Sequence, residues 1–323
     1  YKRQPMGGSP ELLNAIVQMN QNTYGVDFDP ASELLVTAGA TQAIFTAIQA
    51  LVSVDDEVIV LDPSYDCYDP SIVLAGAKPV HVGLDEQFRP DWNKIEEACN
   101  AHTRMIVINN PHNPCGTLWS KSDFEALIQL CEKFPRLLVL SDEVYEYIYF
   151  EKEFVSIKEY SELKERSICV SSFGKTFHIT GWKIGYLSAP TELMIEIKKV
   201  HQFVVFCVNN GAQVALAKYI KIANFNEIQR LYKVKRDLFI KLLKSSRFDL
   251  MPCEGSFFIL ASYKRISDLG DVEFCEELTK KHGVAAIPTS VFNADLRDDK
   301  IIRFCFAKTD ETLIEASQRL CKI

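Results

Sequence analysis

The chain has 323 residues, which is long enough for one large domain and a second, smaller one. Hydrophobic residues make up 47% and charged residues 24%, as in ordinary globular proteins, and the net charge of -7 argues against nucleic acid or an anionic membrane as a partner. No apolar stretch approaches the ~20 residues that a membrane-spanning helix needs.

Short apolar runs alternate with amphipathic stretches in the first part of the chain. The runs that we predict as strands are residues 34–36, 58–61, 79–82, 105–108, 137–140, 168–170 and 184–187. The helices predicted between them are 42–51, 66–75, 92–99 and 123–133, the last preceded by an N-capping signature at 120–123. This alternation predicts a seven-stranded, mainly parallel sheet that is covered by helices on both faces.

The pattern changes after residue 187. Long helices are predicted at 192–205, 213–222 and 227–245, followed by shorter strands at 256–260, 285–287 and 301–306 and by helices at 272–282 and 309–320. This predicts a smaller α+β domain that is joined to the first by a long helix. We therefore expect an arm at 1–10, a large domain at 11–222 and a small C-terminal domain at 223–323.

The ten cysteines occur singly, without a CxxC motif or a cysteine–histidine cluster of zinc spacing. Unpaired thiols of this kind fit a reducing compartment, so we expect a cytoplasmic protein with no metal. The first residue is Tyr1 rather than methionine, and we expect the chain to be part of a longer polypeptide.

Residues that directly follow strands carry most functional weight, because ligands of open parallel sheets bind outside the carboxyl ends of the strands. After the first strand, Gly39, Ala40 and Thr41 lead into a helix. Small residues let the backbone approach an anion, and the helix N-terminus offers free N–H groups. The turn is a candidate phosphate cradle, although such turns also arise for steric reasons alone.

The strand at 105–108 runs into a segment with two prolines, Pro111 and Pro114. Each proline restricts the residue before it to extended conformations, so the turn is rigid and Asn113 holds its amide at a fixed geometry toward the cleft. Asparagine and proline are also favoured in turns without any function.

The strand at 137–140 is followed by Asp142 and, three residues on, by Tyr145. A carboxylate at a strand end can pair with a protonated pyridine nitrogen and keep the ring an electron sink. The hydroxyl of Tyr145 could bind a phenolic oxygen of the same ring. The alternative is that Asp142 only caps a following helix.

The strand at 168–170 leads into a turn rich in glycine and serine that carries Ser172, Lys175 and Lys183. A lysine enclosed among aromatic residues has a lowered pKa because burial disfavours its charged form, and the neutral amine attacks carbonyl groups. Lys175 is thus a candidate Schiff-base lysine, and Lys183 could hold a phosphate. The alternative is a solvated loop with two ordinary lysines.

These four turns, in this order, resemble those of the class I aminotransferases, which use pyridoxal 5′-phosphate (PLP). The Asn-Pro-x-Asn-Pro-x-Gly spacing at 110–116 and the run Asp-Glu-Val-Tyr at 142–145 match motifs of that family. The resemblance implies an α/β protein of fold type I, the PLP-dependent transferase fold. Its large domain holds the mainly parallel seven-stranded sheet, and a smaller α+β domain follows at the C-terminus.

The resemblance also implies a role for each candidate residue. Lys175 would bond to PLP and move a proton of the substrate, while Asp142 would stabilise the protonated ring nitrogen. Asn113 and Tyr145 would bind the phenolic oxygen of the cofactor. The residues that would anchor its phosphate are Ala40, Thr41, Ser172 and Lys183.

Three outlying residues extend the resemblance. Tyr65, just past a strand, would stack on the pyridine ring. Arg303 lies in an apolar strand, where an unpaired guanidinium is costly, and binding of a substrate α-carboxylate next to Asn113 is favoured over a buried structural ion pair. Tyr1 would reach across a homodimer to the partner's cofactor phosphate, although its distance from Pro5 leaves one residue of slack in the match.

These roles predict a PLP-dependent aminotransferase that passes an amino group to a 2-oxo acid. We identify no second cation for a dicarboxylic substrate, and Tyr65 and Phe206 favour an apolar or aromatic side chain. The stretches at 172–186, 195–201 and 272–288 resemble the bacterial methionine aminotransferase subgroup, which is close to the kynurenine–glutamine transaminases. Methionine is therefore the leading amino donor, and the amino acceptor stays open.

Two other functions are compatible with the same fold. One is a PLP-dependent carbon–sulfur β-lyase, which would release pyruvate and a thiol from cystathionine. The other is the PLP-binding sensor domain of a transcription regulator, which would carry a helix-turn-helix before Tyr1; no basic recognition helix is visible in the sequence. A nucleotide-binding α/β protein is disfavoured because no GxGxxG or GxxxxGK motif follows a strand.

Overall fold

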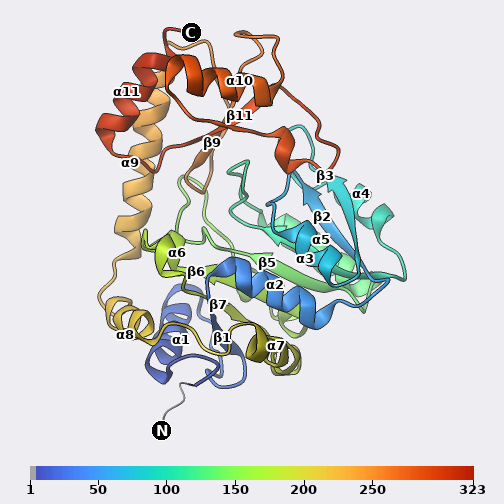
Figure 1. Ribbon diagram of the computed structural model, residues 1–323. Coiled ribbons are helices and arrows are strands. Elements are labelled where there is room, and N and C mark those ends of the chain that lie inside the picture. Colours follow the sequence, from blue (N-terminus) through green and yellow to red (C-terminus); the bar gives the residue numbers. More distant parts are fainter. Residues whose placement is uncertain (1–4) are drawn as a thin grey trace.

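The computed structural model describes residues 5–323, and at its centre is a seven-stranded sheet with the strand order β1-β7-β6-β5-β4-β2-β3 (Figure 1). The strands are β1 (Leu34–Thr37), β2 (Glu57–Asp62), β3 (Lys78–Gly83), β4 (Thr103–Asn109), β5 (Leu138–Asp142), β6 (Ser167–Ser172) and β7 (Gly185–Ser188). Neighbouring strands are parallel except at β7, which is antiparallel to both β1 and β6. The predicted mainly parallel sheet of seven strands is confirmed.

Helices cover both faces of this sheet (Figure 1). They are α1 (Pro10–Tyr24), α2 (Ala40–Leu51), α3 (Tyr68–Leu74), α4 (Trp92–Ala98), α5 (Lys121–Lys133), the short α6 (Phe173–Thr176), α7 (Thr191–Val204) and α8 (Asn210–Tyr219). Successive side chains of a strand point to opposite faces, and in β2 both sets are buried. Val58 and Val60 join a core that includes residues of α2, α3 and α7, whereas Ile59 and Leu61 join one that includes residues of α4 and α5.

The C-terminal part contains a second sheet of four strands in the order β10-β11-β9-β8, with antiparallel pairing throughout. Its elements are α9 (Phe225–Leu243), β8 (Asp249–Leu250), β9 (Phe258–Ser262), α10 (Asp271–Glu277), β10 (Ile287–Pro288), β11 (Ile301–Cys305) and α11 (Asp310–Leu320). The long helix α9 leads from the large sheet to this part (Figure 1). Residue 222, where we expect the large domain to end, lies between α8 and α9. Short 3₁₀ or π turns occur at η1 (Ile157–Glu159), η2 (Ser161–Arg166), η3 (Thr180–Trp182), η4 (Leu278–His282) and η5 (Ser290–Phe292).

Some elements differ from the prediction. Helix α1 was not predicted, although its ends are marked in the sequence: the Ser9 hydroxyl accepts a hydrogen bond from the amide of Leu12, and Gly25 ends the helix with a left-handed φ of 68°. The two-residue strand β8 carries too short a pattern to detect. Helix α3 begins at Tyr68 rather than at residue 66. Across residues 5–323, none of the helices combines the length and apolar character needed to cross a bilayer.

Candidate active site

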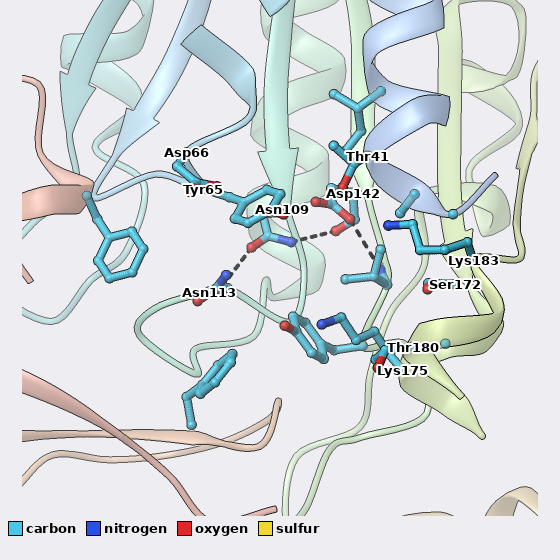
Figure 2. A pocket seen from close by; sticks show the side chains of 18 of the residues that line it. Thr41, Tyr65, Asp66, Asn109, Asn113, Asp142, Ser172, Lys175, Thr180 and Lys183 are labelled. Carbon is cyan, nitrogen blue, oxygen red and sulfur yellow. Dashed lines mark hydrogen bonds between the residues drawn. The ribbon is translucent and has the colours of Figure 1, made fainter. Parts of the chain in front are cut away.

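A cavity of about 500 Å³ lies where β1, β4, β5 and β6 end and the C-terminal sheet approaches them (Figure 2). The sequence-predicted residues that line it are Ala40, Thr41, Tyr65, Asn113, Asp142, Tyr145, Ser172, Lys175, Lys183 and Arg303. Residues more than 200 positions apart in the chain thus meet in one space. Tyr1, the remaining predicted site residue, lies outside the described residues.

One end of the cavity has the geometry of an anion cradle. Within residues 5–323 no side chain caps the N-terminus of α2, whose N-cap Gly39 has a φ of 80°. A Cβ at Gly39 would lie 3.5 Å from Nζ of Lys183, itself held in the left-handed region with a φ of 53°. The uncapped helix N-terminus, the Lys183 ammonium and Ser172 therefore offer donors to one anion.

Gly185 brings the elements of this cradle together. It is the first residue of β7 and pairs with Thr37 of β1 on one side and with Ser172 of β6 on the other. A Cβ at this position would lie 2.8 Å from the carbonyl oxygen of Ser171 and 3.1 Å from the amide nitrogen of Ala40. The close approach of β7 to the start of α2 thus requires glycine, a requirement that the sequence analysis did not recognise.

Asp142 is the last residue of β5 and is 3% exposed. Its Oδ2 accepts a hydrogen bond of 2.7 Å from the hydroxyl of Tyr68, and its backbone oxygen accepts one of 2.8 Å from Nδ2 of Asn109. Burial raises the pKa of the Asp142 carboxyl to about 6, against the lowering effect of the Tyr68 hydrogen bond. Turns rather than a helix follow Asp142, so the alternative that it caps a helix is wrong.

Asn113 is oriented by a second asparagine. Its backbone amide donates a hydrogen bond of 2.7 Å to Oδ1 of Asn109, the same side chain that contacts the end of β5 (Figure 2). The side-chain oxygen of Asn113 accepts a hydrogen bond from Nη1 of Arg303. The two-proline turn thus holds the side-chain amide of Asn113 against the Arg303 guanidinium, and Asn113 still lines the cavity.

Lys175 lies in α6 and places its amine beside two adjacent aromatic rings. Its Nζ is 5.8 Å from the ring centroid of Tyr145 and 5.5 Å from that of Phe257. Burial lowers the pKa of the Lys175 amine, and the charge of Asp142 opposes this effect only in part. The structure therefore supports a desolvated amine rather than an ordinary solvated lysine.

Arg303 lies in β11 between two aromatic rings. Its guanidinium carbon is 3.9 Å from the ring centroid of Phe258 and 4.9 Å from that of Phe292. Among residues 5–323 no carboxylate lies within ion-pair distance of it, and its buried Nε has no hydrogen-bond partner. The alternative of a structural ion pair is therefore wrong for the described part of the chain, and the guanidinium keeps donors for an anion.

Several lining residues were missed by sequence reasoning. Phe258, Val291 and Phe292 come from the C-terminal part of the chain and line the cavity near Arg303. No local pattern marks them, because the contact between the two sheets alone brings them there. Phe206, which we expected near the substrate, lies just after α7 with 36% of its surface exposed and is not among the residues that line the cavity.

Comparisons with known proteins agree with these observations. The profile of the family Aminotransferase class I and II matches residues 2–320. Methionine aminotransferase of Escherichia coli (strain K12) is 46% identical over 320 residues, which cover 98% of this chain and 83% of that protein. Kynurenine–oxoglutarate transaminase 3 of Homo sapiens is 33% identical over 348 residues, covering 98% and 76%. The crystal structure of a methionine aminotransferase from Escherichia coli matches with a TM-score of 0.97 at 45% identity, covering 100% of this chain and 85% of that one.

Proposed function

The chain belongs to the class I and II aminotransferases, and we propose that this aminotransferase takes its amino group from an apolar or aromatic amino acid, with methionine as the first candidate. The observation that carries the proposal is the distribution of charge in the cavity. Within residues 5–323 its cations are Lys175, Lys183 and Arg303. Lys175 and Lys183 are assigned to the cofactor, and Arg303 is assigned to the α-carboxylate that all amino-acid substrates have. No further lysine or arginine of residues 5–323 lines the cavity to pair with a second substrate carboxylate.

The remaining walls support the same substrate class. Beside Arg303 the cavity is lined by the side chains of Phe258, Ile287, Val291 and Phe292, which are apolar. An apolar wall gains free energy when it covers a thioether or an aromatic ring and gives no compensation for a buried carboxylate. The relative named methionine aminotransferase, 46% identical, points to methionine within this class.

We propose PLP as the cofactor, and the donor set fits it. The cradle at Gly39, Ala40, Thr41, Ser172 and Lys183 would hold the phosphate. Across the cavity, Asp142 would pair with the ring nitrogen, Asn113 and Tyr145 would bind the phenolic oxygen, Tyr65 would cover the ring, and Lys175 would bond to the cofactor. When bound, PLP supplies a conjugated ring that withdraws the electrons left when the substrate Cα–H bond breaks.

The residues of this chain then divide the work of proton transfer. Arg303 binds the α-carboxylate and orients the amino acid, since its guanidinium has a buried donor without a partner among the described residues. Lys175, as a neutral amine, accepts the proton from Cα and holds it at Nζ. Phe258 and Phe292 exclude water from the carboxylate site, which strengthens the charge pairing there.

We also propose that the enzyme is a homodimer. Large apolar side chains are exposed along α7 and the residues after it, including Phe203 at 86%, Val204 at 46% and Phe206 at 36%. Exposed apolar surface of this kind is typical of interfaces. Tyr1 would contribute to the partner's phosphate site. All ten cysteines are unpaired, which supports a reducing compartment such as the cytoplasm.

An absorbance spectrum before and after addition of L-methionine tests the proposed function. We expect a band of bound PLP that bleaches with L-methionine and returns when a 2-oxo acid is added. Pyruvate and a thiol released from cystathionine would instead identify a β-lyase, and a bound cofactor that no amino acid alters would indicate a sensor. Lys175→Ala should abolish turnover; retained transamination would refute the assignment of Lys175.

A further inference from the structure

Tyr68 is a buried tyrosine that contacts two proposed cofactor residues without lining the cavity itself. It is 2% exposed. Its hydroxyl donates a hydrogen bond of 2.7 Å to Oδ2 of Asp142. Its ring packs edge-on against Tyr65, with the centroids 5.8 Å apart and the planes at 81°. Resting on the proposed function, we infer that Tyr68 is a positioning residue: it keeps Asp142 ionised for the cofactor ring nitrogen and fixes the plane of Tyr65.

The fold explains why one side chain reaches both residues. Strand β2 and strand β5 lie on either side of β4, so the segment that follows β2 stands close to the end of β5. Tyr65 lies in that segment, and Tyr68 begins α3 three residues later. The spacing directs the two rings against each other and leaves the Tyr68 hydroxyl at the carboxylate.

The hydrogen bond also assigns different roles to the two oxygens of Asp142. Oδ2 is occupied by the Tyr68 hydroxyl, whereas Oδ1 has, in the described part of the chain, only a long contact of 3.4 Å from the amide of Val144. Burial and the charge of Asp142 raise the pKa of the Tyr68 phenol well above its ordinary value, so this hydroxyl remains a donor at any working pH. Oδ1 is therefore the oxygen available to a cationic ring nitrogen.

The groups around Asp142 show why this donor matters. The titratable groups that face the carboxyl are Tyr65, Cys67 and Tyr68 before and in α3, Glu143 and Tyr145 after β5, and Lys175 in α6. Burial and the Glu143 charge disfavour the ionised carboxylate, while Tyr68 and Lys175 favour it. Lys175 must be neutral to act as a base, and a neutral amine no longer stabilises the ionised Asp142 carboxylate. The hydrogen bond from Tyr68 stabilises that carboxylate in either charge state of Lys175.

Tyr68→Phe tests this inference because it removes the hydroxyl and keeps the ring against Tyr65. The probe is pyridoxamine 5′-phosphate, which has no aldehyde and therefore binds without bonding to Lys175. Its dissociation constant is measured by protein fluorescence between pH 5 and 8. We expect binding near neutral pH to weaken roughly tenfold, as for loss of a hydrogen bond to a charged group. The pH at which affinity falls on the acid side should rise by about one unit.

The phosphate of the probe also titrates near pH 6, but equally in both proteins, so the difference between them reports on Asp142. Tyr263→Phe is the matched control: this tyrosine is fully buried and its hydroxyl donates a hydrogen bond of 3.0 Å to the oxygen of Leu269, away from the cavity. We expect its affinity for the probe to fall at the same acidic pH as that of the wild type.

A second variant separates positioning from folding. In an Asp142→Asn background no carboxylate remains to titrate, so adding Tyr68→Phe should change the affinity much less than it does in the wild type. If the affinity of Tyr68→Phe falls at the same acidic pH as that of the wild type, with or without a lower melting temperature, Tyr68 serves the core alone and the inference is overturned. A wild-type protein that fails to bind the probe would overturn the proposed cofactor and this inference with it.

Discussion

Arg303 is a buried cation whose neighbours are two aromatic rings and an amide rather than a carboxylate. The rings fix the plane of the guanidinium and shield it from water, and neither of them uses its N–H donors. A planar fork with free donors matches a carboxylate in two parallel hydrogen bonds, which an ammonium group cannot reproduce.

We predict that Arg303→Lys lowers kcat/KM for L-methionine roughly 100-fold, because the charge remains but the fork is lost. Steady-state kinetics measure this change, and a titration with PLP should show nearly unchanged cofactor binding. Arg297→Lys is the control, since Arg297 is exposed and pairs with Asp299 at 3.0 Å outside the cavity. Equal kinetic losses in both variants would contradict the role of Arg303.

Lys158 is a second buried cation and has the opposite surroundings. Its side chain is 2% exposed, and its Nζ lies 2.8 Å from Glu146 and 3.9 Å from Glu143, two buried carboxylates. It also stands 4.1 Å from the ring centroid of Tyr24. Here the charge is fully paired within the protein, so Lys158 is a stabilising residue rather than a binding one.

We predict that Lys158→Met lowers the free energy of unfolding by about 3–5 kcal/mol, because two buried carboxylates lose their cation. Burial already raises the pKa of Glu143, so the folded state binds a proton more readily than the unfolded chain and stability falls as pH rises above the ordinary carboxyl pKa. The loss should therefore be larger at pH 8 than at pH 5 in urea titrations. Lys164→Met should cost little, because the Lys164 side chain is 53% exposed and its Nζ lies 3.7 Å from Glu33.

The site depends on how closely β7 approaches the N-terminus of α2. Gly185 stands at the point where β1, β7 and β6 meet, and no larger residue fits between the oxygen of Ser171 and the amide of Ala40. The amide of Ala40 is part of the proposed phosphate cradle, so a displacement of β7 would also shift a donor that binds the phosphate.

We predict that Gly185→Ala weakens the binding of pyridoxamine 5′-phosphate and lowers stability by about 1–3 kcal/mol, since the added methyl group must push the strand away from the helix. Gly83→Ala, at the end of β3, places its Cβ where no heavy atom of residues 5–323 lies within 4 Å and serves as the control. Fluorescence titration and thermal unfolding of both variants decide the matter; normal affinity in Gly185→Ala would show that the cradle does not rely on this approach.

For the whole molecule, the exposed apolar surface of α7 and the residues after it is the interface that we propose for the homodimer. We predict that Phe203→Glu shifts the protein from dimer toward monomer in analytical ultracentrifugation, because a charge would replace a side chain that is 86% exposed and apolar. Leu296→Glu changes a side chain that is 70% exposed near the C-terminal sheet and should leave the mass unchanged. If Phe203→Glu dimerises as strongly as the wild type, the interface does not lie at Phe203.

Much of this architecture could be predicted from sequence because its signals are local. Apolar runs mark the strands, and Asn113, Asp142 and Lys175 stand at or within a few residues of the ends of three of them, where ligands of parallel sheets bind. The contacts of Tyr68 and Phe292 could not be predicted, since each joins segments that are remote in the chain. No local pattern states that a tyrosine at the start of α3 will meet a carboxylate 74 positions later.

The antiparallel strand β7 has a consequence for how the site is assembled during folding. Ser172 and Gly185 are direct partners in the β6–β7 ladder, so the segment that carries Lys175 and Lys183 is a loop closed at its neck by adjacent strands. Contacts of such short sequence separation form on the microsecond scale of hairpins, whereas Arg303 and Asn113, 190 positions apart, meet only when the two sheets dock. Refolding should therefore bring Ser172, Lys175 and Lys183 together first. The N-terminus of α2, which follows β1 and its pairing of Thr37 with Gly185, and the proposed carboxylate site at Arg303 should join later.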